Sequence, residues 1–242
     1  MDQARVAPAA TRRASRWRSP WVLLGVPALI FVALTINVLA SGPLVGTDQR
    51  IRVFAQSHWG SAGWHWLDAP ARLVVNLASP SVAVPVLAAA ALAASARRRS
   101  LRPLLTAAVA VVLLLVTVIP AKILIGRLGP GRLRPPSGGM GSFPSGHTTT
   151  ASVCYALMVL LLLPYLPAWI RRAALATLPV WCLLVGAALV WGNYHWFTDV
   201  AAGWALAAIV IQVTVRLTRD AYSHLSTPPE VPDERIASPS TT

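Results

Sequence analysis

The sequence predicts an all-α polytopic membrane protein with six transmembrane helices. Of its 242 residues, 55% are hydrophobic and 12% are charged, and the mean hydropathy is +0.59. Soluble domains carry about 25% charged residues, so this deficit indicates that lipid is the solvent. The apolar runs are also long enough to cross the bilayer core, which requires about 20 helical residues. We expect spans at residues 21–40, 72–96, 103–121, 148–167, 173–192 and 199–217.

These spans form one membrane domain, 21–219, which lies between two tails. The N-terminal tail, 1–20, is basic, and the C-terminal tail, 220–242, has a composition typical of disorder. The motif "VLA" at the end of the first run, just before Ser41, also resembles a signal-peptide cleavage site, but the run is longer than usual for such a peptide, which favours an uncleaved anchor. Cys154 and Cys182 lie inside spans without the spacing of metal ligands, so both are predicted to be packing residues.

The net charge of +13 encodes the topology. Arginines gather before the first span and after the second, fourth and sixth spans, at 5–18, 97–102, 171–172 and 216–219. With six spans these groups all fall on one side, which the positive-inside rule assigns to the cytoplasm together with both termini. A nucleic-acid-binding surface would not alternate with apolar runs in this way, so no nucleic-acid partner is expected.

A basic segment on the opposite side departs from this trend. "AKILIGRLGPGRLRPP", residues 121–136, places four cations within thirteen residues: Lys122, Arg127, Arg132 and Arg134. Its glycines and prolines prevent a continuous helix. Binding of an anion is the simplest functional explanation, and a solvated loop in contact with lipid headgroups is the alternative.

The segment "SFPSGHTTTAS", residues 142–152, opens the fourth span. A helix that starts here points its unpaired N–H groups outward, and such an end attracts phosphate. Ser145 can cap the helix and donate its hydroxyl, while Gly146 lets the backbone approach a ligand closely. His147 can exchange a proton near neutral pH. The alternative is a capping turn with an interfacial histidine.

A second histidine precedes the sixth span in "NYHWFTDVAAGWA", residues 193–205. His195 and Asp199 are four positions apart, hence on one face if the helix begins early enough. A carboxylate on one ring nitrogen fixes the tautomer and leaves the other nitrogen free as a nucleophile. Asp199 also needs a partner, because an unpaired charge at the membrane edge is costly. An interfacial histidine beside an aspartate at a helix N-terminus is the alternative.

The three segments lie on the same predicted side, at the ends of adjacent spans, which indicates a single site. Together they resemble the three signature segments of the type 2 phosphatidic acid phosphatase (PAP2) superfamily: a basic loop, then "PSGH", then "HWFTD". The resemblance covers residues 100–215, and the first two spans suit the six-helix membrane branch. It implies a PAP2-type helical core and a metal-independent phosphatase, without a cofactor, that works through a phosphohistidine.

The resemblance also implies a role for each matching residue. His195 would attack phosphorus, oriented by Asp199, and His147 would protonate the leaving oxygen and then activate water. The phosphate oxygens would be held by the "PSGH" and basic segments. The ligands that we expect there are Ser145, Gly146, Lys122, Arg127 and, as a further ligand, Arg134.

Two features depart from the family pattern. The first segment of the family usually reads Lys, six residues, Arg-Pro, whereas here Lys122 lies twelve residues before Arg134. Pairing Lys122 with Arg127, or Arg127 with Arg134, gives two competing registers. The third segment usually has an arginine six residues before its histidine, where this chain has Leu189. We hypothesise that a surplus cation of the expanded loop, Arg132 or Arg134, replaces that arginine; the alternative is that catalysis is impaired.

The sequence therefore predicts a plasma-membrane phosphatase that acts on a lipid phosphate or diphosphate at the extracytoplasmic face. Undecaprenyl diphosphate, phosphatidic acid and phosphatidylglycerol phosphate all fit, and the orientation suits the first best. A lipid-linked phosphotransferase with the same intermediate is one alternative, and a non-catalytic lipid-binding protein, favoured by Leu189, is another. Six spans argue against the soluble haloperoxidase branch of the superfamily. The oligomeric state does not follow from the sequence.

Overall fold

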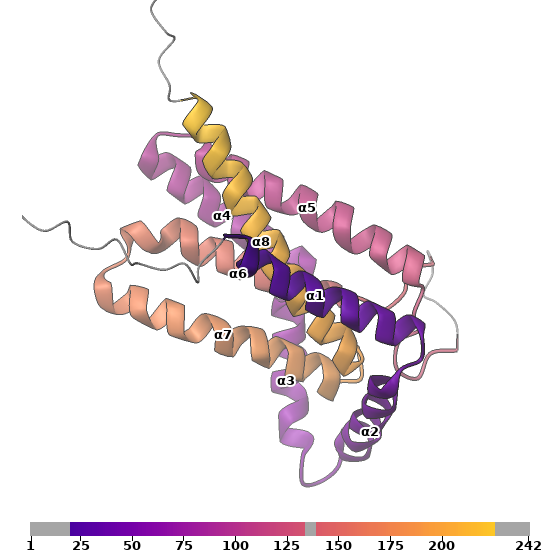
Figure 1. Cartoon of the computed structure of the whole chain (residues 1–242). Helices are drawn as coiled ribbons and strands as arrows, with labels where there is room; N and C mark the ends of the chain where they lie inside the picture. The colour runs from indigo at the N-terminus through magenta and orange to yellow at the C-terminus, as the bar shows by residue number, and fades with distance from the viewer. Residues whose placement is uncertain (1–19, 134–138, 226–242) are drawn as a thin grey trace, which may run out of the picture.

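The protein is a bundle of helices, seen in a computed structural model that describes residues 20–133 and 139–225 (Figure 1). The long helices are α1 (Pro20–Leu39), α4 (Pro80–Arg98), α5 (Arg102–Ile125), α6 (Gly146–Leu162), α7 (Ala168–Trp191) and α8 (Phe197–Leu225). Two shorter helices, α2 (Pro43–His58) and α3 (Asp68–Leu77), precede α4. Most of the two predicted tails, 1–20 and 220–242, lies outside the described residues.

The helices bear out the expected all-α multi-pass membrane protein. Within the described residues, α4, α5, α6, α7 and α8 are each long and apolar enough to cross a membrane. Helices α1 and α2 meet at a bend of 82° and pass the same test as a pair. Residues 20–133 and 139–225 therefore contain five such helices, or up to six spans if the bent pair counts as one.

Two predicted boundaries were wrong, both because of proline. The second span begins at Pro80 instead of residue 72, because α3 ends at Leu77 and Ser79 is extended, with ψ 146°. Proline at the first turn of the new helix lacks only an N–H that would have no partner there. The third span continues through Pro120 to Ile125, since membrane helices tolerate an internal proline. Lys122 consequently lies on α5, in its last turn.

Helix α6 is the centre of the bundle and packs against α4, α5, α7 and α8, while α1 runs along α8. Small side chains fill its surface, among them Thr149, Ala151, Ser152 and Cys154, which are buried. Such residues let neighbouring helices approach closely, as is usual in membrane bundles. The predicted packing role of Cys154 is confirmed, since its side chain belongs to the apolar core between α4, α5, α6 and α8.

One end of the bundle gathers the irregular segments. The break between α1 and α2, the loop between α5 and α6 and the turn between α7 and α8 lie together there, with α2 and α3 projecting beyond them (Figure 1). The α4–α5 and α6–α7 connections lie at the opposite end (Figure 1). The predicted basic, "PSGH" and "HWFTD" segments therefore meet at one end of the bundle.

Candidate active site

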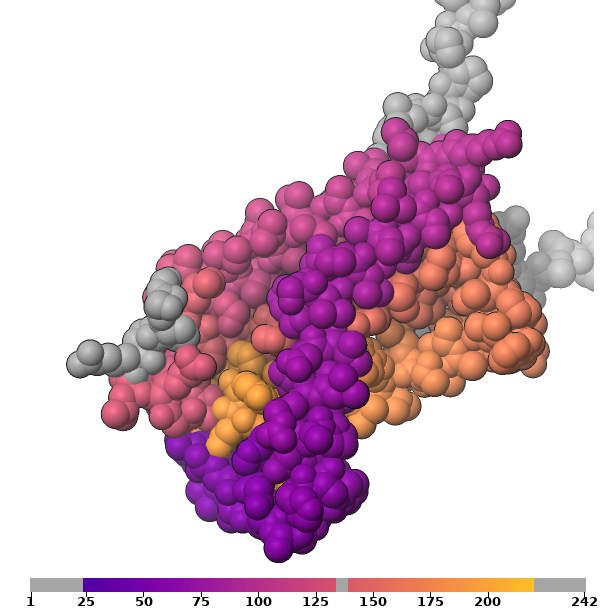
Figure 2. Space-filling model, turned by 180° about the vertical axis from the view of Figure 1, so that it is seen from behind, coloured from indigo at the N-terminus to yellow at the C-terminus, as the bar shows by residue number. Residues whose placement is uncertain are grey.

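A cavity of about 330 Å³ lies at this end. Figure 2 shows the region from behind, where the start of α8 is visible in a hollow between the loop that follows α5 and the α3–α4 segment. Its lining contains two histidines and two cations: His147, His195, Lys122 and Arg132. Backbone and small side chains from Gly129, Gly141, Ser142 and Gly146 complete much of the remaining wall, together with Pro80, Met140 and Tyr194.

The N-terminus of α6 forms one wall of this cavity. Ser145 caps the helix as expected, because its Oγ accepts hydrogen bonds from Thr148 N (3.2 Å) and Thr148 Oγ1 (2.9 Å). Its side chain is fully buried and is not part of the cavity lining, unlike Gly146 and His147. The structure therefore places Ser145 behind the wall as a cap, with the first residues of α6 facing the cavity.

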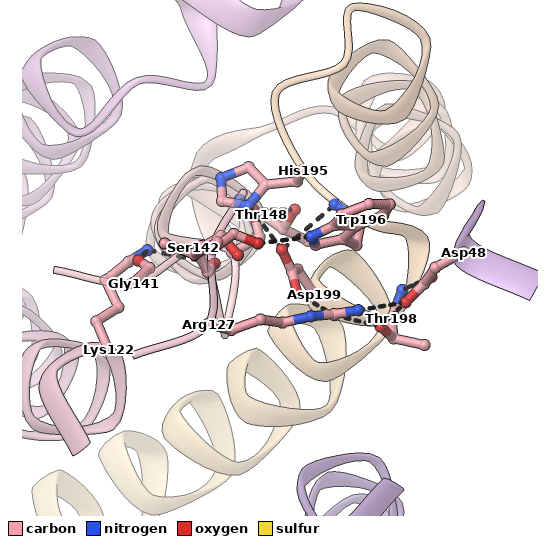
Figure 3. Close-up of polar contacts among 12 residues, drawn as sticks. Asp48, Lys122, Arg127, Gly141, Ser142, Thr148, His195, Trp196, Thr198 and Asp199 are labelled. Atoms are coloured by element: carbon pink, nitrogen blue, oxygen red, sulfur yellow. Dashed lines mark hydrogen bonds and ion pairs between the residues drawn. The ribbon is translucent and has the colours of Figure 1, made fainter. Parts of the chain in front are cut away.

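His195 stands opposite His147. The two ring centroids are 6.4 Å apart and the ring planes are inclined by 59°. Asp199 Oδ2 lies 3.3 Å from His195 Nδ1 (Figure 3). The carboxylate therefore engages Nδ1, and Nε2 is the ring nitrogen that remains for a substrate. The predicted i, i+4 pairing is present, although His195 precedes the first residue of α8.

The turn before α8 fixes the position of His195. Leu189 O accepts hydrogen bonds from Tyr194 N (2.9 Å) and His195 N (3.3 Å), and Asn193 adopts a positive φ of 60°, which asparagine tolerates. Asp199 also reaches back to the turn, accepting from Trp196 N at 3.3 Å. The side chain of Leu189 is fully buried in an apolar cluster with Val185 and Val200, away from the cavity lining.

Lys122 and Arg132 are the described cations of the cavity. Lys122 Nζ donates to Gly141 O at 2.9 Å and lies 3.4 Å from Ser142 O, so it also anchors the loop (Figure 3). A Cβ at Gly146 would lie 3.4 Å from Lys122 Cε, so glycine leaves room for the lysine to pass the end of α6. Arg132 is exposed on the loop. Arg134, the further predicted ligand, lies outside the described residues.

Arg127, predicted as a phosphate ligand, occupies a different place. Its Nη1 donates to Asp199 Oδ1 and to Thr198 Oγ1, both at 2.6 Å, and its Nη2 donates to Asp48 Oδ2 at 2.6 Å (Figure 3). The guanidinium carbon also lies 5.2 Å from the ring centroid of Trp196. Because Arg127 is not part of the cavity lining, the geometry favours an ion-pair role over contact with phosphate.

Asp48 is the residue of this site that the sequence interpretation missed. It lies on α2 and is buried against the start of α8, where Thr198 N donates to its Oδ1 at 3.0 Å. A signal was present, because acidic residues are scarce in the membrane domain and a buried carboxylate there requires a partner. Its partner, Arg127, is 79 positions away in the chain, so spacing could not reveal the pair.

Close contact between α6 and α8 brings the two histidines together. A Cβ at Gly203 would lie 2.9 Å from Thr148 Cβ and 3.1 Å from Ser145 O, closer than packed atoms tolerate. Ser145 N donates to Asp199 O at 3.0 Å, which joins the two helix ends directly. These contacts hold the wall that carries His147 against the turn that carries His195.

The arrangement suits transfer of an anionic group. The imidazole of His195 is paired with a carboxylate, and a second imidazole faces it. Cations and a helix N-terminus line the same cavity, and such groups stabilise negative charge on a bound anion. Among the described residues no group of three His, Cys, Asp or Glu side chains could hold a metal ion.

Comparisons with known proteins identify the family and the fold. The family model of the PAP2 superfamily matches residues 103–223, which is 121 of 242 residues. A crystal structure described as the first transmembrane PAP2 type phosphatidylglycerolphosphate phosphatase, from Bacillus subtilis, superposes with a TM-score of 0.66 and 21% identity. The match covers 87% of this chain and 98% of that chain and shows a shared fold. No curated protein matches the chain.

Proposed function

Because the chain belongs to the PAP2 superfamily, we propose that it is an integral membrane phosphatase that hydrolyses a lipid phosphate or diphosphate through a phosphohistidine on His195. The observation that carries this proposal is the cavity in which His195, backed by Asp199, faces His147 beside Lys122 and Arg132. Each of these groups has a function in phosphoryl transfer, and the apolar helices make the protein a multi-pass membrane protein.

In the first step, His195 Nε2 attacks phosphorus in line with the bond to the leaving oxygen. An N–P bond forms as the P–O bond breaks, and His147 gives its proton to the leaving oxygen. Asp199 accepts the Nδ1 hydrogen of His195, which fixes the tautomer that attacks and stabilises the positive charge that develops on the ring. The product alcohol or phosphate ester then leaves.

In the second step, water hydrolyses the phosphohistidine. His147, now neutral, takes a proton from the water as the new P–O bond forms and the N–P bond breaks. Inorganic phosphate is released, and both histidines return to their starting states. Both rings line the same cavity, with their centroids 6.4 Å apart, so both can act on a phosphoryl group bound there.

The phosphate oxygens are held by Lys122, by Arg132 and by the N-terminus of α6 at Gly146. Charge on these oxygens grows in the transition state, where preorganised cations and N–H groups stabilise it most. Arg132 takes the place of the family arginine that is missing at Leu189, because it is the described arginine of the cavity lining. Arg127 supports Asp199 instead.

The site faces the extracytoplasmic side of the plasma membrane, with both termini cytoplasmic. The arginine-rich α4–α5 and α6–α7 connections lie at the end of the bundle opposite the cavity (Figure 1), and the positive-inside rule places such connections in the cytoplasm. A substrate then reaches the cavity from the outer leaflet. Undecaprenyl diphosphate suits this orientation best, and phosphatidic acid and phosphatidylglycerol phosphate remain within the proposed class.

The test is phosphate release by the detergent-purified protein in EDTA, with a panel of these three lipids and His195→Ala as the control. The proposal predicts release that persists in EDTA and is lost in the variant. Release abolished by EDTA would contradict metal independence. Release that persists in His195→Ala would contradict the assignment of the nucleophile.

A non-catalytic lipid-binding role is the second candidate, and the observation that favours it is the apolar, buried Leu189. It predicts binding of the same lipids without release of phosphate by a folded protein. A phosphotransferase is separated from a hydrolase by adding candidate alcohol or sugar acceptors and identifying the phosphorylated product.

A further inference from the structure

The membrane domain, 21–219, contains three of the chain's 8 acidic residues, and all three are buried: Asp48, Asp68 and Asp199. Burying a carboxylate is costly unless it is paired and hydrogen-bonded. Asp199 faces His195, and Asp68 holds the segment between α2 and α3 by accepting from Gly60 N and Trp191 Nε1. Asp48 lies on α2 outside the cavity, yet its contacts lead to the same histidine.

Asp48 holds the residue next to Asp199. Its Oδ1 accepts from Thr198 N at 3.0 Å, and its Oδ2 accepts from Thr198 Oγ1 (Figure 3). Thr198 lies in the first turn of α8, where backbone N–H groups have no partner within the helix. Asp48 therefore caps α8 from another helix and fixes the turn that carries Asp199.

Asp48 also shares the charge of Arg127. The guanidinium bridges Asp48 and Asp199 at 2.6 Å on each side, and the side chains of both aspartates are 0% exposed. If Arg127 faced Asp199 alone, its full positive charge would offset the charge that Asp199 presents to His195, strongly so in a site with little water. With two aspartates and one arginine, the three side chains carry a net charge of −1 and Asp199 Oδ2 stays negative toward the ring.

We propose that Asp48 is a positioning residue for the reaction: it acts through Thr198 and Arg127 to keep Asp199 placed and charged for His195. This inference rests on the proposed function. Asp48 does not line the cavity, so its removal affects the chemical step and leaves substrate binding nearly intact. A fall in kcat at a nearly constant KM is the signature of this role.

The test uses Asp48→Asn, which keeps the side-chain volume and an oxygen for Thr198 N while removing the charge. We expect kcat for lipid phosphate release to fall about 100-fold, the size typical of small displacements in a catalytic constellation. The double variant Asp48→Asn/Arg127→Gln restores the net charge of −1, and we expect it to recover about 10-fold of that loss, because coupled neighbours are not additive.

Asp68→Asn is the matched control. Asp68 is a buried aspartate at the same end of the bundle, and its described hydrogen bonds go to Gly60 N and Trp191 Nε1 and not to either histidine. Asparagine at this position should therefore lower the melting temperature without changing kcat per folded molecule. Folded protein is quantified by size exclusion before each assay. If Asp48→Asn does not fold, the double variant is compared with this control in its place, and a reduced kcat at constant KM supports the inference.

Three outcomes overturn the inference. The first is an Asp48→Asn protein, or the double variant in its place, that melts early but keeps its kcat, as the control does. The second is a double variant no more active than folded Asp48→Asn, because the charge of Asp48 would then not be what offsets Arg127 beside Asp199. The third is an unsubstituted protein that releases no phosphate, which overturns the proposed function as well. The first two leave that function standing.

Discussion

Arg127 and Arg132 lie five positions apart in one basic segment, and the structure gives them opposite surroundings. Arg127 is enclosed by two carboxylates, a threonine hydroxyl and the ring of Trp196, with 11% of its side chain exposed. Arg132 is exposed and lines the cavity. One basic segment thus contains two kinds of cation: Arg127 neutralises the protein's own buried carboxylates, and Arg132 lies exposed at the cavity.

The difference arises from what each arginine can reach. Arg127 lies two residues after the end of α5, next to the start of α8 and to α2, where Asp199 and Asp48 present buried oxygens. A planar guanidinium can satisfy two carboxylates at once, whereas an ammonium group acts as a single point of charge. Arg132 follows a Gly-Pro-Gly turn that carries the chain away from these acids and over the cavity.

The largest effect is expected for Arg127→Ala. This change leaves Asp48 and Asp199 buried without the cation between them, and breaking a buried pair in this way costs about 3–5 kcal/mol of unfolding free energy. Thermal unfolding in detergent, compared with Arg132→Ala, measures the difference. Equal melting temperatures for the two variants would show that Arg127 is not the structural member of the pair.

For Arg132→Ala we expect a smaller effect, and on activity instead of stability. Loss of a charged hydrogen bond to phosphate removes about 1.5–3 kcal/mol, which corresponds to a decrease of about 10- to 150-fold in kcat/KM. The melting temperature stays unchanged because the side chain is exposed. Arg132→Lys keeps the charge and recovers part of the rate. Unchanged kinetics in Arg132→Ala would end the hypothesis that this arginine replaces the one missing at Leu189.

The smallest effect is expected for Gly203→Ala, which forces α8 away from the N-terminal end of α6. The added Cβ meets Thr148 and the backbone of Ser145, and such overpacking costs about 1–3 kcal/mol of stability. We expect kcat to fall as His195 moves from His147. Gly46→Ala is the control, since nothing lies within 4 Å of its added Cβ. Equal kcat values for the two variants would mean that the α6–α8 contact does not set the histidine geometry.

Much of the fold could be predicted because helices that cross lipid must be long and apolar, which the composition shows directly. Apolar length placed the spans and arginine-rich connections grouped their ends, and the helical segments agree with both. Proline boundaries were less predictable. Pro80 begins a helix and Pro120 lies inside one, and the choice depends on whether neighbouring backbone groups find partners, which local sequence does not specify.

The site was predictable where its chemistry is local. His195 and Asp199 are four residues apart, and Ser145 caps the helix that His147 enters, so spacing alone placed these side chains correctly. The role of Arg127 was not predictable in this way. Its partner Asp48 comes from α2, and the contact exists only because α2 folds back against the start of α8 after the 82° bend.

Transfer of the phosphoryl group to His195 can be tested by trapping the phosphoenzyme. Purified protein is mixed with a substrate radiolabelled in its terminal phosphate, quenched in alkali, and compared with His195→Ala and His147→Ala. We expect protein-bound label that survives alkali and is released by acid, as a phosphohistidine is. The label should be absent in His195→Ala. In His147→Ala, which lacks both the acid for the first step and the base for hydrolysis, it should form more slowly and persist longer. Equal labelling of His195→Ala, or phosphate release by unsubstituted protein without any trapped label, would contradict the account.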